Sequence, residues 1–219
     1  MSSSTLYRLS GLALLLGAVL GGIGQILGNI LFSSDGSLQS TNPLGWGLFL
    51  VFNIGSLLLL AGMPGICVRQ ASRAGWPGFV GFALTFLGMF MLTSSSFTNL
   101  LIVPWLAQVA PQVIAHGDGP PALFVFFLMG HLLFAVGGIL LGIAMLRARI
   151  LPGFAGLLLL SGTILNLVSF PLNGSIGTIV GTVAIVLVAL GLGWPGYALM
   201  TVPSPGEVQP ASARAEVHV

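Results

Sequence analysis

The residues of this chain that could do chemistry are a single histidine and a few amides and hydroxyls. His131 is the only ionisable side chain expected well inside an apolar segment, and such a residue is by default a hypothesis about function. The alternative is a neutral histidine that donates one hydrogen bond to a neighbouring helix. Haem ligation by an opposing pair would need a second buried histidine, but His116 and His218 lie outside the apolar segments. A haem is therefore not expected.

Catalytic and metal-binding constellations are missing from the sequence. The chain has four acidic residues, none within an apolar segment, and one cysteine, Cys67. Paired carboxylates, a metal-spaced cluster of Cys and His, and a Ser-His-Asp set are therefore excluded. The letters GLGWPG at 191–196 match the dinucleotide fingerprint, but they end an apolar helix instead of joining a strand to a helix. We predict no catalytic residue, no metal ligand and no cofactor.

Five further polar residues lie in apolar helices at a similar depth. Gln25 and Asn29 are one helical turn apart, and the others belong to two more helices. In the orientation argued below, all of them fall in the outer half of the membrane. There they would line a cavity for a small neutral or apolar ligand, although interhelical hydrogen bonds of about 0.6 kcal/mol each are an alternative explanation. The candidate cavity residues are Gln25, Asn29, Asn53, Ser56, His131 and Asn166.

The elements that must position these residues are membrane helices. Only 5% of the residues are charged, 56% are hydrophobic and the mean hydropathy is +1.08, whereas soluble domains are about a quarter charged. Apolar runs of about 20 residues match the thickness of a bilayer. The predicted fold class is all-α, a polytopic transmembrane bundle of six helices. We expect them at 7–32, 44–68, 76–96, 121–146, 151–172 and 176–200.

The arginines indicate the orientation, since basic residues accumulate in cytoplasmic connections. All six basic residues are arginines, and alternate connections and both terminal segments carry them. Both termini are therefore predicted to be cytoplasmic, in a multi-pass protein of the bacterial cytoplasmic (inner) membrane. The first apolar run, 9–32, is longer than the core of a signal peptide, so we predict a helix rather than a cleaved leader. A net charge of +2 argues against a nucleic-acid partner.

Two other segments need placement. The stretch 97–114 is too long to extend the third helix inside a bilayer, and Pro104, Pro111 and Trp105 favour a short helix along the outer interface. The alternative is a kinked, protruding end of the third helix. The stretch 201–219 contains no apolar run and is predicted to be a disordered cytoplasmic tail.

An internal repeat relates the two central hairpins. An offset of 75 residues, without any gap, aligns Gly55 with Gly130 and Pro77 with Pro152, together with several Leu and Phe positions. The repeat units are about 44–96 and 121–172. Since both would begin outside, the repeat is parallel, with its axis along the membrane normal. A third hairpin would combine the last helix with the first.

Small residues are expected to hold the helices together. In the first helix, spacings of four, three and four place four glycines on one face. This face is expected to pack inside one subunit, with a dimer seam as the alternative. The glycines are Gly17, Gly21, Gly24 and Gly28.

Two stretches carry a resemblance to a known family. RARILPGFAGLLLLSG at 147–162 and YRLSGLALLLG at 7–17 resemble bacterial six-helix membrane proteins of the domain-of-unknown-function family 4386. This resemblance implies the six-helix topology and no activity or site residue. Three functions stay open: a non-enzymatic membrane component or partner subunit, a transporter or receptor for a small neutral or apolar ligand, and a membrane enzyme acting on lipid or quinone. The expected partners are membrane lipids, with another membrane subunit or a second copy as an open possibility.

Overall fold

The computed structural model describes residues 3–32, 36–115, 121–172 and 174–201, and these ranges contain helices without strands. The prediction of an all-helical chain is confirmed for them. In chain order, the helices are α1 (Ser3–Phe32), α2 (Gly36–Thr41), α3 (Pro43–Phe97), the π-helical turn η1 (Thr98–Ile102), α4 (Val103–Val109), α5 (Pro111–Ala115), α6 (Pro121–Ala148), α7 (Gly153–Ser169) and α8 (Gly174–Thr201).

Helix α3 consists of two antiparallel arms that meet at Gly75. That glycine has a φ of 59°, outside the helical region, and lets the chain reverse between residues 43–74 and 76–97. The first arm begins at Asn42, whose side chain accepts a hydrogen bond of 2.9 Å from the Leu44 amide, with Pro43 at the first helical position. The two helices predicted at 44–68 and 76–96 correspond to these arms.

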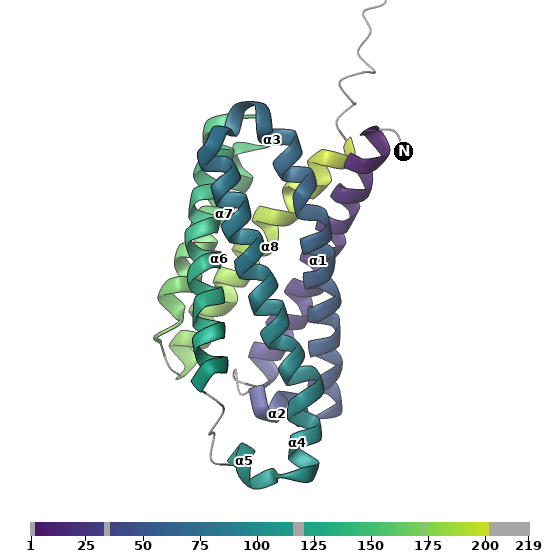
Figure 1. Cartoon of the computed structure of the whole chain (residues 1–219), viewed down its shortest axis with the longest axis vertical. Helices are drawn as coiled ribbons and strands as arrows, with labels where there is room; N and C mark the ends of the chain where they lie inside the picture. The colour runs from purple at the N-terminus through teal and green to yellow at the C-terminus, as the bar shows by residue number, and fades with distance from the viewer. Residues whose placement is uncertain (1–2, 33–35, 116–120, 173, 202–219) are drawn as a thin grey trace, which may run out of the picture.

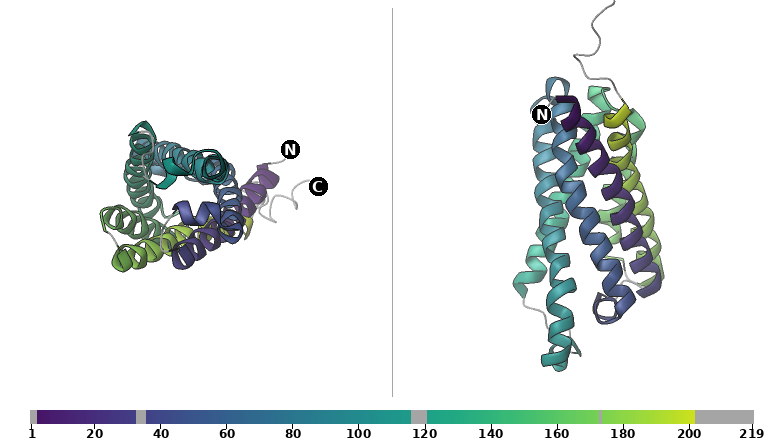
Figure 2. Two further views of the ribbon diagram at one scale, coloured as in Figure 1. Left: turned by 90° about the horizontal axis from the view of Figure 1, so that it is seen from below. Right: turned by 90° about the vertical axis from the view of Figure 1, so that its right-hand side faces the viewer.

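The long helices pack as a closed ring. Helix α1 contacts the first arm of α3 on one side and α8 on the other. The ring continues from α8 to α7, from α7 to α6, and from α6 to the second arm of α3. Figure 1 shows the helices side by side, and the end-on view in Figure 2 shows the ring. Each helix therefore runs antiparallel to both of its neighbours.

The two ends of the ring differ. One end, here named the arginine end, carries every arginine of the described residues: Arg8, Arg69, Arg73, Arg147 and Arg149. The opposite end carries the short helices α2, α4 and α5 (Figure 1). Helix α2 contacts α1, α3, η1 and α4, and it lies across that end within the outline of the ring (Figure 2).

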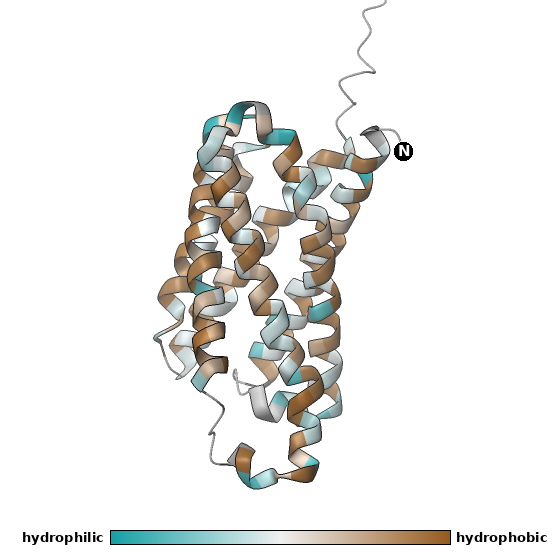
Figure 3. Cartoon of the chain, viewed as in Figure 1, coloured by the Kyte–Doolittle hydropathy of each residue, from teal (hydrophilic) through white to brown (hydrophobic). Residues whose placement is uncertain are grey.

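The helices are of the membrane-spanning kind. Five of them are long and apolar enough to cross a bilayer: Thr5–Phe32, Pro43–Ala71, Arg73–Val109, Pro121–Ala148 and Gly174–Thr201. Hydrophobic residues, drawn in brown, recur along these helices (Figure 3), and many large apolar side chains are exposed. The sixth apolar helix, α7, has 17 residues and a length of about 26 Å at 1.5 Å per residue. This is slightly less than the hydrocarbon thickness of about 30 Å, so a sixth crossing stays a prediction.

The stretch 97–114 continues the preceding helix instead of forming a separate one. The helix runs from Arg73 to Val109, and only α5 is detached, after Ala110. The π-helical turn η1 explains how the helix passes Pro104. Within it the Val103 amide bonds to the carbonyl of Thr98, five residues back, and this wider turn accommodates the proline. The geometry is that of the kinked extension, and its position at a lipid interface stays a prediction.

The glycine face of α1 is filled by α3 and, at Gly28, by Gln39 of α2. A Cβ at Gly24 would lie 2.8 Å from the Leu48 carbonyl oxygen, and one at Gly17 would lie 2.7 Å from that of Gly55. Such close approach of two backbones is the usual role of small residues between membrane helices. This face is therefore occupied within one chain.

Several predictions fall outside the described residues. The tail beyond Thr201 is among them, although Thr201 itself ends α8. So are the acidic residues Asp35 and Asp118 and the histidines His116 and His218. The parallel repeat and the cytoplasmic location of the termini also stay predictions.

Candidate functional site

The interior of the ring changes character along its length. In the half nearest the arginine end, large apolar side chains from α1, the first arm of α3, α6, α7 and α8 fill the centre, each at most 1% exposed. These side chains belong to one buried apolar cluster, which closes the centre of this half. The residues that close it are Leu14, Met63, Leu141, Met145, Leu159 and Leu192.

In the other half, polar residues follow on the same helix faces as the buried apolar residues. On α1, Gln25 continues the helix face of Leu14 and Ala18, because their spacings are close to whole helical turns. On α7, Asn166 similarly follows Leu159 by seven residues. Since neighbouring helices are antiparallel, all six predicted cavity residues lie in this half of the ring.

Asn53 is the most deeply placed of the six. Its side chain is 1% exposed, and its amide nitrogen donates to the Ser96 hydroxyl at 2.9 Å and to the Phe49 carbonyl at 2.8 Å. The bond to Ser96 ties the two arms of α3 together, whereas the bond to Phe49 stays within the first arm. The side-chain oxygen of Asn53 is buried and has no hydrogen-bond partner among the described residues. Such an acceptor is uncommon in folded proteins and costs about 1–3 kcal/mol when left unpaired.

Ser56 and Thr93 extend this buried polar group. Ser56 is one turn from Asn53 on the same face and is 2% exposed. Thr93 is buried on the second arm, where its hydroxyl donates to the Met89 carbonyl at 2.8 Å within its own helix. The four residues Asn53, Ser56, Thr93 and Ser96 form what is here named the α3 polar group.

Gln25 and Asn29 form a second polar pair on α1. The Gln25 amide donates to the Asn29 side-chain oxygen at 3.5 Å, a long bond within one helix. Both side chains are partly buried. This bond leaves hydrogen-bonding capacity on both amides.

His131 lies in an aromatic environment on α6. Its ring is 4.3 Å from the ring of Phe127 and 5.2 Å from that of Phe170, measured between centroids. Its Nδ1 is 3.3 Å from the carbonyl oxygen of Phe127, one turn earlier in the same helix. His131 therefore contacts Phe170, the residue that follows α7, and bonds to the backbone of its own helix. The described residues provide it with no hydrogen bond to another helix.

The six candidates do not meet in one hydrogen-bonded cluster. Among the described residues, the α3 polar group, the Gln25–Asn29 pair and His131 are not linked to one another by hydrogen bonds. Asn166 is partly buried, and its backbone carbonyl accepts from the Ser169 hydroxyl. The structure thus places these residues in one half of the ring, on the four helices α1, α3, α6 and α7.

Ser96 and Thr93 were missed as candidates from the sequence. They belong to the run TSSS at 93–96, close to the predicted end of the third helix. Such a run resembles a helix terminus. The helix instead continues past it, so these hydroxyls lie inside the bundle. The sequence did contain a signal for them: Asn53, buried on the first arm, needs a polar partner on a neighbouring helix.

Groups of three or more potential metal-ligating residues do not occur among the residues that the structure describes. No family model matches this chain, and neither curated proteins nor solved structures gave a match. The resemblance to the domain-of-unknown-function family 4386 is therefore untested.

Proposed function

We propose that this chain is a non-enzymatic, multi-pass membrane protein that binds a small neutral ligand in the polar half of its helix ring. The observation that carries the proposal is the contrast between the two halves of the interior. Near the arginine end most buried side chains are apolar, and the buried polar ones there are Ser10, Gln70 and Thr85. Toward the opposite end the buried side chains include the α3 polar group, and Gln25 and Asn29 are partly buried on α1. A site that is polar at one end and closed at the other suits binding better than conduction.

The chemistry of the lining defines the ligand. The α3 polar group offers a buried amide oxygen without a donor, and Gln25 and Asn29 offer further amide groups. All described arginines lie at the other end of the ring, and the four acidic residues fall outside the described ranges. The lining therefore favours an uncharged molecule that carries a hydroxyl or N–H donor on an apolar body.

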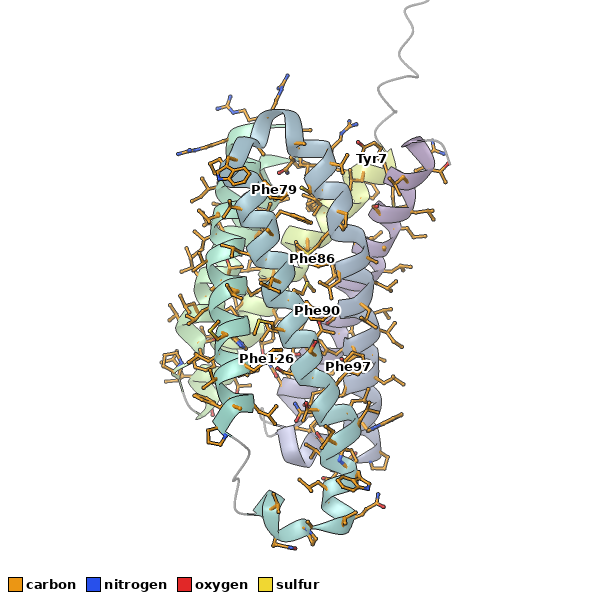
Figure 4. The ribbon with its side chains drawn as sticks, viewed as in Figure 1. Tyr7, Phe79, Phe86, Phe90, Phe97 and Phe126 are labelled. Atoms are coloured by element: carbon orange, nitrogen blue, oxygen red, sulfur yellow. The ribbon has the colours of Figure 1, made fainter. Side chains whose placement is uncertain are left out.

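The aromatic residues of the same half suit the apolar part of such a ligand. Phe90 and Phe97 follow one face of the second arm of α3, and Phe126 lies on the neighbouring α6 (Figure 4). Phe90 is 53% exposed, and Phe126 is 37% exposed. Apolar surface of this kind beside a few polar groups is typical of small-molecule sites.

A ligand-dependent stability assay tests this proposal. The purified full chain is screened in detergent against neutral alcohols, amides and sterol-like amphiphiles, and the shift in melting temperature is measured. The shift given by a hit should disappear in Asn53→Leu and shrink in Gln25→Leu. The matched control is Thr85→Val, which removes a buried hydroxyl on the same helix in the closed half.

Two outcomes would count against the proposal. The first is the absence of a shift across the whole panel for a chain that is folded and monodisperse. The second is a shift that Thr85→Val removes as completely as Asn53→Leu does, because the effect would then lie outside the polar half.

A further inference from the structure

A separate cleft opens at the arginine end, away from the polar half of the ring. It has a volume of about 820 Å³, within the range of about 300–1,000 Å³ that is typical of ligand sites. The connection between α6 and α7 forms one wall, the last two turns of α8 form another, and Arg69 of α3 completes it. Two arginines, Arg69 and Arg149, line this cleft together with Trp194 and Tyr197.

The backbone holds Arg149 at the cleft in an unusual conformation. Arg149 has a φ of 51°, in the left-handed region, and it is the only described residue other than glycine with a positive φ. It directly follows α6, and its amide bonds to the Met145 carbonyl at 3.3 Å, as glycine usually does at this position. A non-glycine residue here is strained by about 1–2 kcal/mol, and such strain is commonly kept where a side chain serves a function.

Arg69 is held at the cleft from the other side. Its guanidinium carbon is 5.7 Å from the centroid of the Tyr7 ring on α1, within the range of a cation–π contact. Neither arginine has a carboxylate partner among the described residues, because all four acidic residues of the chain lie outside the described ranges. The cleft thus presents two positive charges to an occupant.

The remaining walls are amphipathic. Trp194 and Tyr197 are 46% and 58% exposed, and they are the residue types that gather at the headgroup level of bilayers. Leu146, Ile150 and Leu151 supply apolar surface beside them. Charge at the helix ends, interfacial aromatics and adjoining apolar surface together match an amphiphile with an anionic head and a hydrocarbon tail.

We infer that this cleft binds the headgroup of an anionic phospholipid, with its phosphate between Arg69 and Arg149. Guanidinium groups bind phosphate oxygens through paired N–H donors. The aromatic residues lie against the glycerol region, and the acyl chains follow the apolar surface of α7 and α8. The site is independent of the proposed ligand in the polar half.

The test measures lipid retention by native mass spectrometry of the full chain from mixed phosphatidylcholine and phosphatidylglycerol nanodiscs. Retained phosphatidylglycerol should fall about five-fold for each arginine removed in Arg69→Gln and Arg149→Gln. The matched control is the pair Arg73→Gln and Arg147→Gln. It removes equal charge from the same end without touching the cleft, and it should leave retention nearly unchanged.

Three results would overturn the inference. One is an equal loss in both pairs of variants, which would indicate general attraction to a charged surface. Another is that free glycerol phosphate stabilises the chain as much as phosphatidylglycerol does, which would indicate a soluble phosphate ligand. The third is unchanged retention in Arg69→Gln combined with Arg149→Gln, which would show that neither arginine holds the lipid. If the double arginine variant does not fold, Arg149→Gln is compared with Arg147→Gln.

Discussion

Gly55 offers the sharpest test of how α1 and α3 are held together. A Cβ at position 55 would lie 2.6 Å from the Gly21 Cα and 2.9 Å from the Gly17 carbonyl oxygen, and it would also clash with the Gly21 amide nitrogen. All three are main-chain atoms of α1, so no side-chain rotation relieves the overlap and the two helices must separate. Overpacking of this kind costs about 1–3 kcal/mol.

Gly55→Ala should therefore destabilise the chain by about 1–3 kcal/mol, which is a fall in melting temperature of about 2–12 °C for a chain of this size. Thermal unfolding in a mild detergent measures it. Gly47→Ala is the matched control on the same arm, because nothing lies within 4 Å of a Cβ there. If the two variants melt at the same temperature, the packing of α1 against α3 described above is wrong.

Three further substitutions have defined outcomes in the same unfolding assay. Trp46→Phe removes the hydrogen bond of 2.9 Å from the indole nitrogen to the Leu100 carbonyl, and it should cost about 0.5–1.5 kcal/mol; unchanged stability would mean that the bond contributes nothing. Gly75→Ala makes only an ordinary contact, 3.8 Å from the Pro77 Cδ, but requires a φ of 59°, so it should cost about 1–2 kcal/mol through backbone strain. Ser96→Ala deprives the buried Asn53 amide of a partner and should cost about 1–3 kcal/mol, whereas Ser94→Ala, which loses only a bond within its own helix, should cost less.

The helices of this chain could be predicted from the sequence because lipid imposes a simple rule on length and polarity. The limits of α1, α6 and α8 were predicted within a few residues. The short helix α2 was not, since its six residues carry no apolar run. The continuation through Pro104 was ranked second because it depends on a π-helical turn, which local composition does not reveal.

The position of the candidate residues along the helices could be predicted from the sequence, whereas most of their contacts could not. Placing Gln25, Asn53 and Asn166 in one half needed only helix direction and position along each span. Pairing Asn53 with Ser96 required knowing how the arms of α3 meet across 43 residues of sequence. His131 turned toward Phe127 and Phe170 instead of a polar partner. Helical periodicity predicts the helix face on which a residue lies. Which neighbour the residue contacts depends on how the helices pack in the bundle.

The cleft at the arginine end was not predicted at all. Sequence reasoning used the arginines only for orientation, as a count of basic residues on alternate connections. The positive φ of Arg149 could not be predicted from the sequence, because the residue with this conformation after a helix is usually glycine. The contact between Arg69 and Tyr7 likewise depends on the packing of α1 beside α3.

Cysteine accessibility in intact bacterial cells tests the threading and orientation of the chain most directly. In a Cys67→Ser background, single cysteines are placed at Arg73, Arg149 and Gln112, and a membrane-impermeant thiol reagent is added before and after permeabilisation. The predicted result is labelling of Gln112→Cys from outside, with Arg73→Cys and Arg149→Cys labelled only after permeabilisation. Labelling of Arg73→Cys and Arg149→Cys from different sides of the membrane would contradict the account.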